Sequence, residues 1–158
     1  MKSVIVDTNV AMVANGDCEG VRPECRLQTI DFLEKLLQKG RIAIDLEGEI
    51  EEEYWRRLSI GQPGVGSRFM QKFFSEALDR IDRIKVRGHG NNRIDFAFDG
   101  NLRRFDQINR KFVRVAAATG FIIFNATDSD WVEHGIELSK RGIKIQHLCG
   151  AVTAAWFV

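Results

Sequence analysis

Short apolar runs alternate with amphipathic segments along the chain. Unbroken apolar runs are typical of strands buried on both faces, whereas apolar residues at intervals of three and four predict helices. The predicted strands cover residues 4–6, 42–44, 81–86, 121–124 and 143–148. The predicted helices cover residues 25–39, 46–58, 69–78, 102–118 and 131–141. This alternation predicts an α/β fold with three α/β/α layers around a central, mainly parallel sheet.

The stretch at residues 88–101 carries mixed signals. Residues 94–98 alternate like a strand, and Asp99-Gly100 is a turn signal. Residues 61–66 predict a loop, and Asp130 is well placed to cap the helix at 131–141. The strand at 143–148 alternates as an edge strand does, and the apolar end at 151–158 is expected to pack on the sheet or to form a dimer contact.

Composition narrows the class of protein. With 158 residues, 44% hydrophobic and 28% charged, the chain predicts one globular domain over residues 1–158 and excludes disorder. No apolar run approaches the roughly 20 residues that span a bilayer, so no membrane partner is expected. The three cysteines are an odd number and form no CxxC pair, which favours reduced thiols. Reduced thiols, together with the absence of a signal-peptide pattern at the start, favour a cytoplasmic protein.

Acidic residues follow several predicted strands. Asp7 ends the first strand, Asp45 the second, and Asp128 and Asp130 follow the strand at 121–124. Because ligands of parallel sheets bind beyond the carboxyl ends of the strands, these side chains are expected to meet at one edge. Clustered carboxylates repel one another unless a cation neutralises them, and oxygen ligands select Mg²⁺ or Mn²⁺. Taken singly, Asp130 fits a helix cap better than a ligand, and Asp7 fits a loop-capping residue as well as a functional one.

Helical phase selects among the glutamates after the second strand. The residues expected to face inward are Leu46, Ile50, Tyr54 and Leu58. Glu53 lies beside this buried face and is the preferred ligand, and Glu49 is the second choice. The helix at 102–118 places Asn109 at the edge of its apolar stripe, and that stripe is expected to consist of Phe105, Ile108, Phe112, Val115 and Ala116. Asp106 lies one turn before Asn109. The basic residues of this helix suit either a solvated cationic face or a polyanion held over metal ions.

Together these residues resemble the PIN domain family of metal-dependent nucleases. The resemblance rests on their order: Val-Asp-Thr-Asn ending at residue 9, a Glu in the second helix, and Asn-Ala-Thr-Asp-Ser-Asp-Trp ending at residue 131. It departs from the family at Asn109, where an Asp is usual. Three readings stay open: Asp106 serves instead, the site is weakened, or Asn109 is an engineered replacement.

The resemblance implies hydrolysis of phosphodiester bonds, most readily in RNA but open to DNA, with Mg²⁺ or Mn²⁺ as cofactor. It implies catalytic roles for Asp7, Glu53, Asp106 and Asp128, with Asn109 and Asp130 as further metal ligands. Contacts to ligands or to the phosphate backbone are expected from Thr8, Asn9, Arg103, Arg104, Arg110, Lys111 and Ser129.

Alternatives to an active nuclease are also open. The main one is a catalytically impaired PIN-like RNA-binding or scaffold protein, which Asn109 favours. Phosphatases of the haloacid dehalogenase type need a second Asp where Asn9 stands, and no Gly-rich turn follows the first strand as a dinucleotide site requires. The small size fits a toxin with an antitoxin or other protein partner, and a homodimer is a further option.

Overall fold

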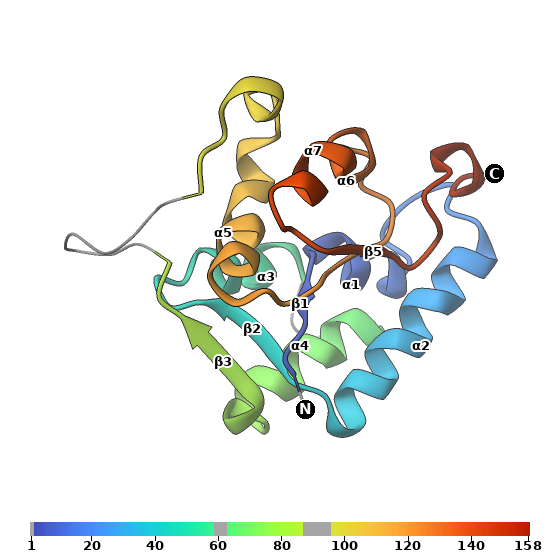
Figure 1. Ribbon diagram of the computed structural model, residues 1–158. Coiled ribbons are helices and arrows are strands. Elements are labelled where there is room, and N and C mark those ends of the chain that lie inside the picture. The colour runs from blue at the N-terminus through green and yellow to red at the C-terminus, as the bar shows by residue number, and fades with distance from the viewer. Residues whose placement is uncertain (1, 59–62, 87–95) are drawn as a thin grey trace.

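The computed structural model describes residues 2–58, 63–86 and 96–158, and these form a mixed α/β fold with parallel strands (Figure 1). Strands β1 (Ile5–Val6), β4 (Ile123–Asn125) and β5 (Ile145–His147) form one sheet in that order. Strands β2 (Ile42–Asp45) and β3 (Ile81–Ile84) form a parallel pair. A parallel bridge from Val4 to Ile42 links the pair to the larger sheet, so β1 lies between β2 and β4.

The burial of the strands matches their sequence patterns. Every residue of β1, β2 and β4 is buried, as their unbroken apolar runs predict, whereas β5 at the edge of its sheet is only partly covered. The predicted strands at 4–6, 42–44, 81–86, 121–124 and 143–148 are therefore confirmed, with shifted ends. Because the pairs are all parallel, β1 and β4 end side by side.

Seven helices are found in the described residues, apart from four short 3₁₀ turns. They are α1 (Thr8–Asn15), α2 (Pro23–Lys39), α3 (Glu49–Arg57), α4 (Val65–Ser75), α5 (Arg110–Thr119), α6 (Asp130–Glu133) and α7 (Gly135–Lys140). The 3₁₀ turns are η1 (Leu78–Arg80), η2 (Gly100–Leu102), η3 (Gln107–Asn109) and η4 (Thr153–Ala155).

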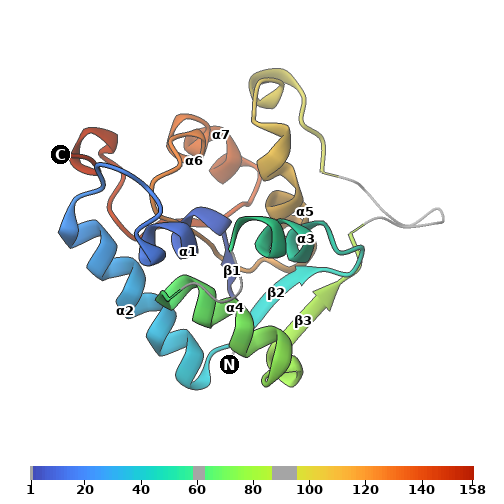
Figure 2. The ribbon, with the colours of Figure 1, turned by 180° about the vertical axis from the view of Figure 1, so that it is seen from behind.

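Helices α1, α2 and α4 pack against one another, while α5 packs on strands β1 to β4 (Figure 2). Gly66 allows α1 and α4 to approach closely, because a Cβ there would lie 2.0 Å from the carbonyl oxygen of Ala11. Asn15 fastens the same contact: its Oδ1 accepts from the backbone N–H of Ser67 at 3.0 Å.

Several helix predictions are corrected. Helix α1 was not expected, and the helix expected at 102–118 begins only at Arg110, because η2 and η3 occupy the preceding residues. Ile108 is consequently 50% exposed and is not part of a buried stripe. Leu46 and Leu78 lie outside the helices assigned to them and are also exposed.

The helix expected at 131–141 is divided into α6 and α7. Asp130 is the first residue of α6 and not its cap, since Ser129 occupies the cap position. The loop expected at 61–66 and the strand expected at 94–98 fall partly outside the described residues. Phe96 and Phe98, which are described, lie in no strand; their rings pack together with centroids 4.9 Å apart.

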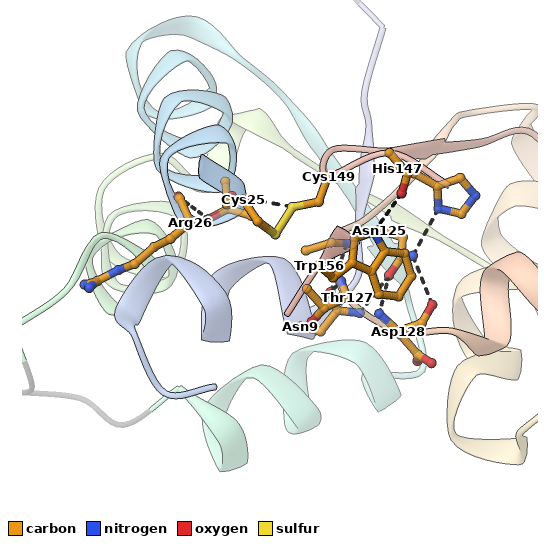
Figure 3. Close-up of a disulfide and its surroundings, with 12 residues drawn as sticks. Asn9, Cys25, Arg26, Asn125, Thr127, Asp128, His147, Cys149 and Trp156 are labelled. Atoms are coloured by element: carbon orange, nitrogen blue, oxygen red, sulfur yellow. Dashed lines mark hydrogen bonds between the residues drawn. A yellow bond between two sulfur atoms is a disulfide. The ribbon is translucent and has the colours of Figure 1, made fainter. Parts of the chain in front are cut away.

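A disulfide joins Cys25 on α2 to Cys149 after β5 (Figure 3). The expectation of reduced thiols is therefore wrong for these two residues, and only Cys18 is free. The bond forms because the C-terminal segment returns to the start of α2, where Val21 pairs with Phe157 and Trp156 is fully buried. The C-terminus therefore packs beside α2. Within the described residues, no helix is long and apolar enough to cross a membrane.

Candidate functional site

Asp7 lies at the carboxyl end of β1 and caps α1. Its Oδ1 accepts from the backbone N–H of Asn9 at 3.3 Å, and its Oδ2 accepts from the indole Nε1 of Trp131 at 2.5 Å. The residue is 4% exposed, and no Lys or Arg of the described segments forms an ion pair with it. Burial raises the pKa of Asp7 to about 7, and the charges of Asp128 and Glu53 contribute to that rise. Asp7 is thus a buried carboxylate that no cationic side chain of residues 2–58, 63–86 and 96–158 compensates by an ion pair.

A network of amides positions the loop that carries Asp128 (Figure 3). Asn125, the last residue of β4, accepts from the backbone N–H of Asp128 and from the side chain of Asn9. Asn9 in turn accepts from the backbone N–H groups of Ala126 and Thr127. Asn9 and Asn125 therefore link the ends of β1 and β4, which places Asp128 near Asp7.

Burial also raises the pKa of Asp128. A hydrogen bond from Asn109 opposes this rise, and the nearby charges of Asp130 and Asp106 add to it. The effect of Asp128 on the pKa of Asp7, and of Asp130 and Asp106 on Asp128, shows that these carboxylates are electrostatic neighbours.

Glu53 joins the cluster from α3, as predicted in preference to Glu49. Its side chain is 5% exposed, and both of its oxygens are occupied. The Thr8 hydroxyl donates to Oε2, and the ammonium group of Lys111 lies 3.0 Å from Oε1. The next residue, Tyr54, donates its hydroxyl to the backbone carbonyl of Val6 at 2.5 Å, which fixes α3 against β1.

Asp45 does not join this cluster. Its two oxygens accept from the backbone N–H groups of Glu49 and Ile50 at 2.7 and 2.8 Å. It therefore stabilises the N-terminus of α3, where a negative charge is favourable.

Asn109 is buried at the position where the resemblance leads one to expect an Asp. Its Nδ2 donates to Asp128 at 2.8 Å and to Asp130 at 3.2 Å. Asp106 is exposed, and its Oδ1 accepts from the backbone N–H of Ile108 at 3.0 Å. Its backbone N–H also donates to Asp130 at 3.1 Å. Asp106 is thus at the margin of the cluster, whereas Asn109 is inside it.

One trio of ligand atoms meets within 4.8 Å in the described part of the chain. It consists of Asp130, Glu133 and His134. The carboxylates of Asp7, Glu53 and Asp128 are close enough to shift the pKa of Asp7 but are not drawn together to that distance.

A groove of about 480 Å³ adjoins the Glu53 side of the cluster. Its lining includes four cationic side chains and two glutamates, so cations predominate. The lining residues are Glu49, Glu52, Arg56, Gln107, Arg110, Lys111 and Arg114. Arg56 and Arg114 were not among the residues predicted to contact substrate, although Arg114 lies one turn after Arg110 on the basic face of α5.

The residues predicted to contact substrate have different environments. Arg103, Arg104 and Ser129 are exposed, as such a role requires. The guanidinium of Arg110 donates to the carbonyls of Arg103 and Phe105, so it is partly engaged within the protein. Thr8, Asn9 and Lys111 have roles inside the site: they bond to Glu53 or to the loop after β4.

Trp131 also belongs to the site, although it was not predicted from the sequence to be a site residue. It is fully buried, and its indole donates a hydrogen bond to Asp7 and packs edge-on against Phe105.

Comparisons with protein-family models, curated proteins and solved structures find no match to this chain.

Proposed function

We propose that this protein is a PIN-like nuclease that hydrolyses phosphodiester bonds of RNA with Mg²⁺ or Mn²⁺. The observation that carries the proposal is the burial of Asp7 without a cationic partner among the described residues, beside Asp128 and Glu53. Burying an unpaired charge is costly, so proteins keep such groups where a ligand compensates them. The proposed fold has three layers, with α5 on one side of the strands and α1, α2 and α4 on the other; the packing of α5 on β1 to β4 supports it.

The donor set fits a hard divalent cation. Asp7 and Asp128 offer carboxylate oxygens, with Glu53, Asp130 and Asp106 nearby, and hard cations prefer such oxygen ligands. When bound, the cation stabilises negative charge on the phosphate and lowers the pKa of water. Trp131 and Asn9 orient the Asp7 carboxylate, and Asn125 orients the loop that bears Asp128.

The groove beside Glu53 is the proposed path of the RNA backbone. Arg56, Arg110 and Arg114 line it, and Arg103 and Arg104 extend the positive charge on the exposed surface. Contacts from such side chains to phosphates give salt-dependent affinity without reading the base sequence. Four further points stay predictions from the sequence: DNA as a substrate, an antitoxin or other protein partner, a homodimer, and a cytoplasmic location.

A cleavage assay tests this function. Purified protein is incubated with single-stranded and structured RNA, with Mn²⁺ or with EDTA, beside an Asp7→Asn variant. We expect the wild type to cleave RNA in the presence of Mn²⁺ and not in the presence of EDTA. We expect Asp7→Asn to abolish cleavage while RNA binding is retained. Asp17→Asn, a change at an exposed carboxylate beyond the end of α1, is the matched control and should retain activity. Full activity in Asp7→Asn would refute the proposed site.

A second candidate is a PIN-like RNA-binding or scaffold protein without catalysis. The specific observation in its favour is that Asn109 donates its amide to both Asp128 and Asp130, where an Asp would add a ligand. Calorimetric titration with Mn²⁺ separates the two functions. Binding of Mn²⁺ favours the nuclease, whereas RNA binding without Mn²⁺ binding favours the scaffold.

A further inference from the structure

Lys111 places a positive charge inside the carboxylate cluster. It belongs to the first turn of α5, and its side chain is only 10% exposed. Its ammonium group donates to Glu53 Oε1 at 3.0 Å and to the backbone carbonyl of Ile108. Both acceptors hold it in place, so it is a fixed internal cation and not a mobile surface lysine.

The two sides of the cluster differ in charge compensation. Both oxygens of Glu53 have donors, because Thr8 takes Oε2 and Lys111 takes Oε1. Asp7 and Asp128 receive hydrogen bonds from neutral groups, and no ion pair from a Lys or Arg of the described chain reaches either one. The uncompensated negative charge is therefore on the side of Asp7 and Asp128.

We propose that Lys111 serves as a built-in second cation, so that this centre takes one divalent ion on the side of Asp7 and Asp128. A second divalent ion beside Glu53 would need the oxygens of this residue, where the ammonium group already lies and where like charges repel. The inference rests on the proposed metal-dependent function and specifies its metal stoichiometry. It also assigns Lys111 a positioning role toward Glu53 in place of the phosphate contact expected from the sequence.

The test counts Mn²⁺ ions bound to the metal-free protein, by equilibrium dialysis with electron paramagnetic resonance detection of free Mn²⁺. We expect one ion in the wild type and in Lys111→Arg, which keeps the charge. We expect two ions in Lys111→Met, which removes the charge but keeps a long unbranched side chain. Lys140→Met, a change at an exposed lysine on α7, is the matched control and should bind one ion.

The outcomes distinguish this inference from the proposed function. Two ions in the wild type, or one ion in a folded Lys111→Met variant, would overturn the role of Lys111 and leave the metal centre standing. No ion in any variant would overturn the proposed function, and the inference with it. Because the wild-type count decides between one and two ions by itself, the test stands even if Lys111→Met does not fold.

Discussion

Replacing Asp7 with Asn is expected to stabilise the metal-free protein at alkaline pH. The pKa of Asp7 is raised from its ordinary 3.8 to about 7 in the folded protein, chiefly by burial. The folded state therefore binds this proton more tightly than the unfolded state does. The contribution of this proton to the free energy of unfolding is fully present below the pKa of Asp7 in the unfolded state. It is lost as the pH rises through the pKa of Asp7 in the folded state.

The size of the effect follows from the shift. The rise to about 7 amounts to roughly 4 kcal/mol of lost stability once Asp7 is ionised, at about 1.36 kcal/mol per pKa unit. More than half of this loss falls between about pH 5 and about pH 8. Asn has one acceptor oxygen, so one of the bonds from Trp131 and Asn9 is lost, at a cost of about 1 kcal/mol. Asp7→Asn should therefore be more stable than the wild type by about 3 kcal/mol at about pH 8.

Urea unfolding in EDTA measures the difference at each pH. Asp7→Asn is compared with the wild type and with Asp17→Asn, whose carboxylate is exposed and should leave the pH dependence unchanged. Parallel stability curves for Asp7→Asn and the wild type would contradict this prediction, since Asp7 would then titrate as an exposed group does. At about pH 8, adding Mn²⁺ should stabilise the wild type and not Asp7→Asn, because a ligand stabilises only the state that binds it.

Three further changes have defined outcomes. Cys149→Ser opens a disulfide that joins residues 124 apart, so it should lower the free energy of unfolding by up to about 5 kcal/mol on the loop-entropy account; an unchanged urea midpoint would contradict this. Before reduction, a thiol assay should find the single free Cys18. Arg114→Glu should weaken RNA binding and reduce its salt slope by about 1, whereas Lys35→Glu, a change at an exposed lysine of α2, should not; equal filter-binding curves would count against the groove. Asn109→Asp should tighten Mn²⁺ binding on the order of tenfold and raise the cleavage rate, and a calorimetric Kd no lower than that of the wild type would contradict it.

The strands and their buried faces were predictable because the pattern there is local. An unbroken apolar run such as residues 121–124 is typical of a strand covered on both faces, and β4 takes up Ile123 and Phe124 of this run. The parallel arrangement then brings the carboxyl ends of β1 and β4 together, so the meeting of Asp7 and Asp128 followed from topology. The choice of Glu53 also followed, from its phase relative to the buried Ile50 and Tyr54.

Two helical regions could not be predicted correctly from the local sequence pattern, and the causes are opposite. Helix α1 is buried around much of its surface, at Val10, Ala11, Val13 and Ala14, so it shows no contrast between apolar and polar faces. The segment before α5 shows a helical pattern that the chain does not adopt. There Asp106 caps η3 through the backbone N–H of Ile108, and this local bond competes with a continuous helix.

The pairings that decide the site's charge are long-range. Lys111 and Glu53 are 58 positions apart, and Cys25 and Cys149 are 124 apart. In the sequence alone, a lysine on a basic helix face is compatible with an exposed charge. An odd number of cysteines is compatible with free thiols. Only the packing of α5 beside α3, and the return of the C-terminus to α2, selects the buried alternative.

The arrangement of donors explains why Asn109 can stand inside the cluster without disturbing it. Asn125 holds the backbone of Asp128, and Trp131 and Asn9 hold the Asp7 carboxylate, so these contacts do not involve residue 109. Asn109 only adds a neutral donor between Asp128 and Asp130, which eases their repulsion in the absence of a cation. The scaffold and the charge of the site are therefore separable: a carboxylate at position 109 would change the affinity for a cation more than the positions of the groups that hold it.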